Sequence, residues 1–233
     1  MIYDYRDSKD IAIDYYYLNI NKNDTVLINP DAEYVLIYNA YRLPNRLYKT
    51  FDFNNVKNLS LSNVVIDESA NIKWPKNPHS VCLRQVLGLD IDLDFSGVHN
   101  NFSVSDTSMK YVRFPKYVNE LSLRCVYDIR GNVDFSGVQK LLYIENTDFS
   151  KAQVNFPTAT SVRVFAQNIK GLRGIIDLRN ASNVHFVNNS GDFYVRYHSG
   201  INADEATKKF LLQNNNEYIV RHNHNLSRDY KIR

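Results

Sequence analysis

The stretches LDFSGVHNNFSV (93–104) and VDFSGVQKLLY (133–143) repeat one pattern at a distance of forty residues. Each contains an aspartate between two apolar residues, then a serine and a glycine, and ends in alternating apolar side chains. Such alternation is typical of a β-strand with one buried face. The shared DFSGV core therefore predicts a structural repeat in which the glycine marks a corner between two strands.

The strand that follows the corner recurs along the chain as pairs of inward-facing apolar residues. These eight pairs are Val35/Ile37, Leu59/Leu61, Val81/Leu83, Phe102/Val104, Leu121/Leu123, Leu141/Tyr143, Val162/Val164 and Val184/Phe186. Successive pairs start 19 to 24 residues apart. One such unit cannot bury its own apolar side, whereas stacked units bury a continuous core and pair equivalent strands. We predict a mainly β protein, a short parallel β-solenoid of about eight turns.

The two ends of the repeat are predicted to be capped, because a solenoid otherwise exposes apolar strand edges. Residues 1–24 hold the run IAIDYYYLNI (11–20) and are expected to form an N-terminal cap before the repeat solenoid of residues 25–199. Residues 200–233 are expected to hold a C-terminal helical cap, ADEATKKFLLQ with Asn202 as its N-cap, and a basic tail that is flexible or pairs with a partner.

Three copies of the repeat carry a further apolar residue before the pair. They read Val56-x-x-Leu59-x-Leu61, Val118-x-x-Leu121-x-Leu123 and Val138-x-x-Leu141-x-Tyr143. The pattern resembles leucine-rich repeats over residues 26–190, and the corner of VRFPKYVNELSL (112–123) is similar to bacterial BspA-like repeats. It departs from the standard asparagine position, which Asn146 and Asn189 fit but four other copies fill with valine or threonine. The resemblance implies a solenoid that binds other proteins through the face of its parallel sheet.

The short strand before each corner carries a polar residue in its middle. In chain order these are Asp52, Lys73, Asp94, Arg113, Asp134, Asn155 and Asp177. On consecutive turns they would lie roughly 4.8 Å apart, so each acid would neighbour a base or an amide. A catalytic carboxylate pair would instead need two acids converging on a cleft. We interpret the series as a structural ladder, with catalysis as the less favoured alternative.

The outward side chains of the longer strands give the candidate binding surface. Those on the early turns are small and polar, whereas the last three turns become apolar with a basic rim. The predicted partner-binding residues are Arg84, Arg124, Lys140, Leu142, Ile144, Arg163, Phe165, His185 and Val187. An exposed apolar patch of this kind is typical of a protein-binding hot spot. The alternative is that the C-terminal segment folds back over the patch as part of the cap.

Other motifs with recognisable chemistry are missing from the sequence. No phosphate-binding loop, nucleophile elbow or zinc-protease motif occurs, so no catalytic residue and no cofactor are predicted. His79 and His99 fall in corners and are interpreted as solvated. His222 and His224 form an H-x-H pair, but no acid or cysteine cluster accompanies it, so no metal site is predicted.

The composition limits the cellular locations and the kinds of partner that the sequence allows. The net charge of +3 with no dense basic run allows nucleic acid as a partner without demanding it. No run of about 18 apolar residues occurs, so no membrane span is expected. Cys82 and Cys125 would lie two turns apart, too far for a disulfide. With no leader-like start, we expect a cytoplasmic protein, or one in a host cytoplasm if it is an exported effector or phage product.

Three functions remain open from the residues. The first is a non-enzymatic protein-binding solenoid acting as an adaptor, effector or inhibitor in a bacterial or phage system, including anti-CRISPR-like inhibition. The second is a carbohydrate-binding or carbohydrate-active β-solenoid, motivated by the 17 tyrosines. The third is nucleic-acid binding through Arg84, Arg124 and Arg163 on one sheet face.

Overall fold

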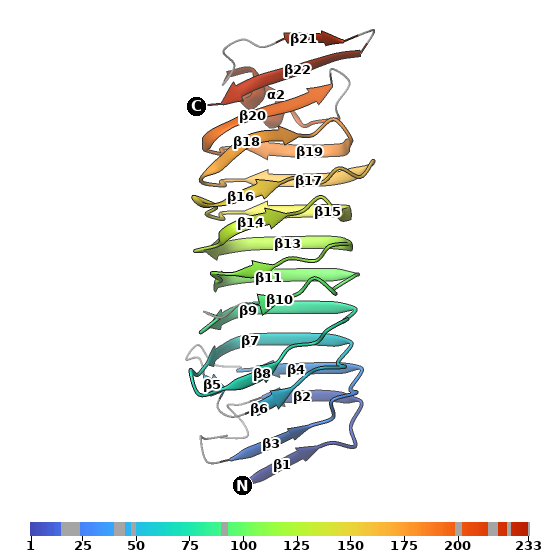
Figure 1. Cartoon of the computed structure of the whole chain (residues 1–233), viewed down its shortest axis with the longest axis vertical. Helices are drawn as coiled ribbons and strands as arrows, with labels where there is room; N and C mark the ends of the chain where they lie inside the picture. The colour runs from blue at the N-terminus through green and yellow to red at the C-terminus, as the bar shows by residue number, and fades with distance from the viewer. Residues whose placement is uncertain are drawn as a thin grey trace.

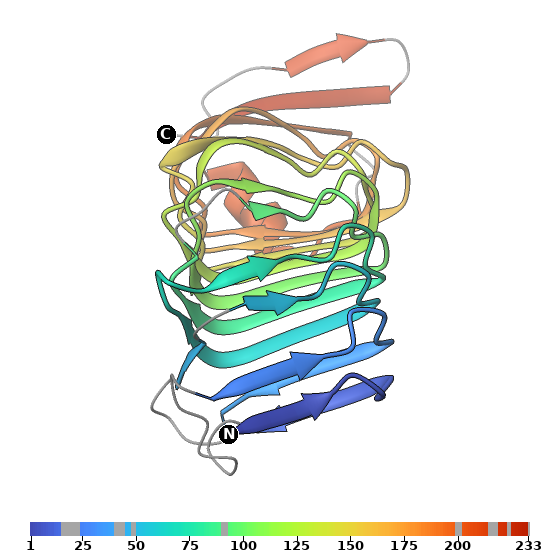
Figure 2. The same cartoon turned by 60° about the horizontal axis from the view of Figure 1, so that its bottom comes forward.

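The chain forms a β-solenoid of about eight turns, mainly β, as the sequence predicts (Figure 1). The computed structural model describes residues 1–14, 24–39, 45–47, 50–89, 93–198, 202–213, 219–222 and 225–232. Each turn lays one strand on each of two walls, and successive turns stack along the long axis with the termini at opposite ends (Figure 1). Figure 2 shows the same stack tilted, with the N-terminal strands nearest the viewer.

One wall is a continuous parallel sheet, here called the main sheet. Its strands are β2 (Asp10–Asp14), β4 (Tyr34–Tyr38), β7 (Asn58–Ile66), β9 (Ser80–Leu87), β11 (Asn101–Ser108), β13 (Val118–Tyr127), β15 (Val138–Glu145), β17 (Val162–Gln167) and β19 (Ala181–Val187). A tenth strand, β5 (Asn45–Leu47), pairs with the end of β7. Neighbours in the sheet are successive turns, so the register links equivalent repeat positions.

The other wall consists of short strands that pair two by two. The pairs are β1 (Ile2–Tyr5) with β3 (Thr25–Ile28), β6 (Thr50–Asp52) with β8 (Asn71–Lys73), β10 (Leu93–Asp94) with β12 (Val112–Arg113), β14 (Arg130–Asp134) with β16 (Lys151–Asn155), and β18 (Leu172–Asp177) with β20 (Gly191–His198). The two DFSGV copies begin in β10 and β14, each the first strand of a pair. The forty-residue distance between them is therefore the length of two turns.

The DFSGV corner is built by its own side chains. The Asp134 carboxylate accepts a hydrogen bond from the backbone N–H of Ser136 at 3.0 Å, and the N–H of Val138 donates to the Phe135 carbonyl at 3.0 Å. The aspartate thereby fixes the turn that follows it, as short polar side chains commonly do. Gly137 is required because the preceding turn passes close: an added Cβ would lie 1.4 Å from the Lys116 carbonyl oxygen.

The interior between the walls is filled by inward aliphatic residues and a chain of contacting aromatic rings. Neighbouring ring centroids lie 5.0 to 6.2 Å apart along Trp74, Phe95, Phe102, Phe114, Phe135 and Phe149. Phe102 lies in β11 of the main sheet, whereas Trp74, Phe95, Phe114 and Phe135 each directly follow a short strand. Removing one of them would leave a cavity that the fixed backbone spacing prevents from closing.

The N-terminal segment differs from the separate cap predicted for residues 1–24. β1 pairs with β3 and β2 pairs with β4, both in parallel, so residues 1–14 add one more turn to the two walls. Ile11 and Ile13 are buried at inward positions of β2 because they alternate as in the later repeats. Residues 15–23, the rest of the proposed cap, lie outside the described residues.

At the C-terminal end a helix takes the place of the next strand of the main sheet. Helix α2 (Glu205–Gln213) packs on β19, where the Thr207 hydroxyl accepts a hydrogen bond from the Phe186 N–H at 2.7 Å. Its N-cap is Asp204 and not the predicted Asn202, since Asp204 Oδ1 accepts the Thr207 N–H at 2.7 Å. Asn202 instead donates to Asn183 of the preceding turn.

The segment predicted as a flexible or partner-pairing tail forms a hairpin. Strands β21 (Ile219–His222) and β22 (Asn225–Ile232) are antiparallel, and β22 also pairs with β20 (Figure 1). His224 lies outside the described residues. Across the part of the chain that is described, no helix is long and apolar enough to cross a membrane.

Candidate functional site

The outward face of the main sheet presents side chains in columns that run along the solenoid. From β7 onward the middle column holds small residues, Ser60, Cys82, Ser103 and Ser122, and then Tyr143, Phe165 and His185. This change divides the face into a half with small polar side chains and a half with large aromatic side chains. The three rings are called the aromatic ladder below.

The sequence-based assignment of this face is wrong by one residue in β15. Leu142 and Ile144, predicted to point outward, are fully buried, while Leu141 and Tyr143 take the outward positions. The pairing of β13 with β15 shifts between Val118 and Glu120, so β15 contains one extra residue there. A one-residue slip moves every following side chain to the opposite face of a strand.

The predicted apolar residue Val187 is also no part of an open surface. It stands opposite Gln167 in the outward register, yet only 7% of it is exposed, on the strand against which α2 packs. Phe165 and His185 are half-buried and stay on the outward face. Residues 202–211 therefore pack at the end of the face and leave the aromatic ladder partly exposed.

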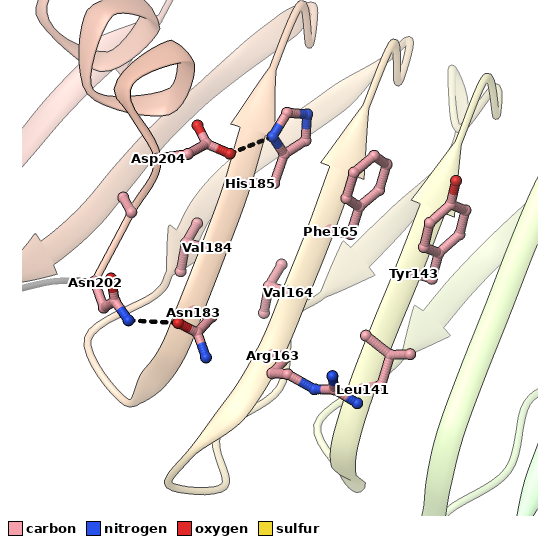
Figure 3. A pocket seen from close by; sticks show the side chains of 11 residues that line it. Leu141, Tyr143, Arg163, Val164, Phe165, Asn183, Val184, His185, Asn202 and Asp204 are labelled. Atoms are coloured by element: carbon pink, nitrogen blue, oxygen red, sulfur yellow. Dashed lines mark hydrogen bonds and ion pairs between the residues drawn. The ribbon is translucent and has the colours of Figure 1, made fainter.

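The rings of the aromatic ladder are stacked in parallel along the solenoid axis (Figure 3). The centroids of Tyr143 and Phe165 lie 4.5 Å apart at an interplanar angle of 3°, and those of Phe165 and His185 lie 4.4 Å apart at 12°. These distances match the spacing of strands in a sheet, about 4.8 Å, so the backbone itself positions the stack. Both faces of Phe165 are covered within the stack, and Tyr143 and His185 each contribute one face to it.

Hydrogen bonds fix both ends of the aromatic ladder. At one end His185 Nδ1 lies 2.5 Å from Asp204 Oδ2, and its Nε2 lies 3.3 Å from Gln167 Oε1. At the other end the Tyr143 hydroxyl donates to Glu145 at 2.8 Å. Burial, together with this bond to Glu145, raises the pKa of Tyr143 above its ordinary value of 10.0, so the hydroxyl stays protonated and keeps donating.

A groove runs beside the aromatic ladder along the last turns (Figure 3). Its second side is formed by Leu141, Arg163, Asn183 and Asn202, and its floor by Val164, Val184 and Ala203. The groove has a volume of about 420 Å³. It offers apolar surface, amide groups and one cation within a few turns of a rigid sheet.

The predicted basic residues do not form one continuous rim. Arg84 and Arg124 lie in the same outer column, separated by Ser105, whereas Arg163 lies across the aromatic ladder from that column. Arg124 forms an ion pair with Glu145 at 3.2 Å. Arg163 is exposed and has no ion-pair partner among the residues that the structure describes. Lys140 is exposed beside the irregularity in β15.

Sequence reasoning missed several groove residues, namely Leu141, Tyr143, Asn183, Asn202 and Asp204. Tyr143 was assigned to the core because its repeat was aligned without the extra residue. A usable signal was present: Tyr143, Phe165 and His185 are spaced by about one repeat and fall in one column once a residue is inserted before Leu141. Asn202 and Asp204 were assigned to the helix cap alone.

The residues of the predicted structural ladder lie side by side in pairs. Lys73 contacts Asp52 at 2.8 Å and Arg113 contacts Asp94 at 3.4 Å, while Asp134 stands in register with Asn155. The hydrogen bond from Lys73 lowers the pKa of the Asp52 carboxyl. Such exposed pairs contribute only about 0–1 kcal/mol each.

Two ladder features differ from the prediction of one alternating series. Asp177 bonds mainly to Arg179 in its own corner, at 2.5 Å, and stands in register with Arg196 of β20. The pairs β6–β8, β10–β12 and β14–β16 are separate two-stranded sheets, and β18–β20 belongs to a sheet with β22 and β21, so the series is interrupted between pairs. A second concavity on this wall includes Asp94 with Arg113 and Arg130, and no second carboxylate is among its described lining residues. It does not supply the paired acids that hydrolysis of a glycosidic bond requires.

We expect Asp204 to make the C-terminal end of the molecule acid-sensitive. Burial alone would raise the pKa of this carboxyl, but hydrogen bonds from Thr207 and His185 outweigh it and hold the pKa below its ordinary value of 3.8. A lowered folded-state pKa adds stability that is present above the ordinary value and is lost as pH falls through the lowered one.

The measurement compares urea unfolding of the wild type and Asp204→Asn between pH 5 and pH 2.5. Asparagine retains the helix cap but cannot titrate. The wild type should therefore lose more stability over this range than the variant. Parallel losses in the two proteins would contradict a role for the charge of Asp204.

The comparisons with known proteins give no further guide. No protein-family model, no curated protein and no solved structure matches this chain. Its function must therefore be inferred from the geometry of the main sheet and the groove.

Proposed function

We propose that this protein is a non-enzymatic binding solenoid that engages a protein partner through the groove beside the aromatic ladder. One observation carries the proposal. The groove combines an ordered aromatic wall, the outward side chain of Leu141 and the cation Arg163, all held on consecutive strands of a rigid sheet. Aromatic and arginine side chains are the residues that most often dominate the energy of protein–protein binding.

The composition of the groove indicates the partner chemistry. The carboxylate in the described lining, Asp204, is bonded to His185 and forms no ion pair with Arg163, so an aspartate or glutamate of the partner would complete an ion pair at Arg163. Leu141 and the ring edges of Tyr143 and Phe165 offer apolar contact, while Asn183 and Asn202 offer amide donors and acceptors. An extended segment of the partner with alternating acidic and apolar side chains could pair with Arg163 and also pack against the apolar surface of the groove.

The carbohydrate and nucleic-acid alternatives have less support. Sugars and bases bind aromatic side chains through exposed ring faces. Phe165 has a ring on each side, so its faces are occupied. Arg84 and Arg124 share one outer column, whereas Arg163 lies across the aromatic ladder from it, and Arg124 is neutralised by Glu145. Neither alternative has a surface as complete as the groove.

The proposal includes a biological role that rests on partner binding alone. The resemblance to leucine-rich repeats of the BspA-like kind supports use of the parallel sheet for partner binding. An adaptor, effector or inhibitor in a bacterial or phage system, including an anti-CRISPR-like inhibitor, would need only such a surface. Function in the cytoplasm, of the producing cell or of a host, is proposed with it.

The test uses a double variant in the groove, Arg163→Glu with Leu141→Asp. Both side chains are outward-facing, so the fold should be retained. A partner would first be captured from cells with the wild-type protein, identified and purified. Its Kd for the double variant, measured by calorimetry, should be at least about tenfold higher, because loss of a hot spot costs about 2 kcal/mol or more.

A matched control reverses the same kinds of residue elsewhere. Lys116→Glu with Tyr117→Asp changes one cation and one large apolar residue at an exposed corner away from the main sheet face. This control should bind the partner with the wild-type Kd. Equal affinity of the groove variant and the wild type would remove the groove from the proposal.

A further inference from the structure

Two histidines that the sequence assigns to solvent meet at one corner of the solenoid. His79 and His99 occupy equivalent positions just before β9 and β11, on adjacent turns, and both are exposed. His79 Nδ1 lies 3.4 Å from His99 Nε2, with the ring centroids 5.2 Å apart and the planes at 75°. Two ring nitrogens therefore approach each other at a surface open to water.

The separation of the two nitrogens fits a shared metal ion. Zinc binds histidine nitrogens at about 2.0–2.1 Å in tetrahedral geometry, which places two such nitrogens about 3.3–3.4 Å apart. The observed 3.4 Å agrees with that separation. A right-angled arrangement with the same bond lengths would require a shorter distance, about 2.8–3.0 Å. The corner is therefore better matched to a tetrahedral ion than to an octahedral one.

The backbone holds both histidines in place before any ion binds. The His79 N–H donates to the Lys57 carbonyl at 2.7 Å, and its own carbonyl accepts the Asn100 N–H at 2.9 Å. The His99 carbonyl accepts the Asn119 N–H at 3.3 Å. Parallel stacking thus fixes the spacing of the two histidine backbones, and a metal ion would replace the hydrogen bond between the two ring nitrogens.

The nearest cation in this column is directed away from the pair. Lys57, one turn before His79, forms an ion pair with Glu33 at 2.7 Å on the turn before that. This bond draws the ammonium group toward Glu33, which lowers its repulsion of a divalent ion at His79. On the other side Asn119 is neutral and hydrogen-bonds to Asn100.

We propose that His79 and His99 form a binding site for Zn²⁺ or a similar divalent transition-metal ion. The ion would be held by His79 Nδ1 and His99 Nε2, with its remaining positions filled by water. This site lies at a corner and is separate from the groove, so it does not depend on the proposed partner binding. It would tie two adjacent turns together outside the main sheet.

The experiment titrates untagged full-length protein with Zn²⁺ by calorimetry and with Co²⁺ by visible absorption. The wild type should show one saturable Zn²⁺ site and a saturable change in the visible absorption of Co²⁺. His79→Asn and His99→Asn should each weaken Zn²⁺ binding by at least about tenfold, the smallest loss usual even for partners behind the ligands. Both variants should keep the wild-type far-UV circular dichroism, since the side chains are exposed.

The H-x-H pair near the C-terminus provides the matched control. His222→Asn with His224→Asn removes two histidines but keeps His79 and His99, and it should leave the Zn²⁺ affinity and the Co²⁺ absorption unchanged. The proposal would be overturned by a wild type that binds no Zn²⁺, or by corner variants that bind as tightly as the wild type. Loss of binding in the control alone would overturn it as well, by placing the ion at the C-terminal pair.

Discussion

Replacing Gly137 by alanine should lower the free energy of unfolding by at least about 3 kcal/mol, the upper end of what overpacking usually costs. The added methyl group would lie 1.4 Å from the carbonyl oxygen of Lys116 on the preceding turn. That oxygen belongs to main chain that is itself anchored, because the Val118 N–H donates to the Gly137 carbonyl at 3.3 Å. It cannot rotate away as the end of a flexible side chain would.

The measurement is urea unfolding followed by circular dichroism, with Gly131→Ala as the matched control. Gly131 lies earlier on the same turn and has a φ of +80°, but no atom lies within 4 Å of an added Cβ. Its replacement should cost only the strain of a left-handed residue, about 1–2 kcal/mol. Equal losses at the two positions would show that contact between turns is not what requires glycine at position 137.

Phe135→Ala should destabilise the protein by about 3–5 kcal/mol, as truncation of a fully buried phenylalanine does in well-packed cores. Phe135 is completely buried and contacts the rings of Phe114 and Phe149, with centroids 5.4 and 6.2 Å away. Strand pairing fixes the distance between the turns on either side. The walls therefore cannot move inward to fill the space that the ring leaves.

A phenylalanine-to-alanine substitution on the outward face distinguishes the energy of core packing from the energy of ring stacking. Phe165→Ala removes an equal number of atoms from a half-buried ring between Tyr143 and His185. It should cost about 1–2 kcal/mol, the sum of two modest ring–ring interactions. A loss as large as that of Phe135→Ala would mean that the aromatic ladder is part of the structural core and not a surface feature.

The architecture was predictable because the pairs of inward-facing apolar residues recur at a nearly constant spacing along the sequence. Val81 and Leu83, or Leu121 and Leu123, alternate in the way a half-buried strand requires, and their recurrence leaves stacking as the only means of burying them. The DFSGV corner was recognisable for the same reason. Its aspartate, however, acts first on its own turn through the Ser136 N–H, a local role that the ladder interpretation did not include.

The candidate surface was only partly predictable, since the face of each residue depends on an unbroken count along the strand. The extra residue in β15 inverts Leu141 through Ile144, and nothing in the sequence of that strand alone distinguishes Leu141 from Leu142. The pair of His79 and His99 was missed for another reason. Each is an unremarkable polar corner residue, and only the stacking of adjacent turns brings their nitrogens together.

The two-by-two pairing of the short strands also bears on how such a chain can change in length. Gene duplication or deletion of a single turn would place one short strand without its mate and leave an aspartate such as Asp94 without Arg113. An event spanning two turns, about the distance between the DFSGV copies, would preserve every such partnership. A change in length by a double turn would therefore keep the short strands paired, whereas a change by a single turn would not.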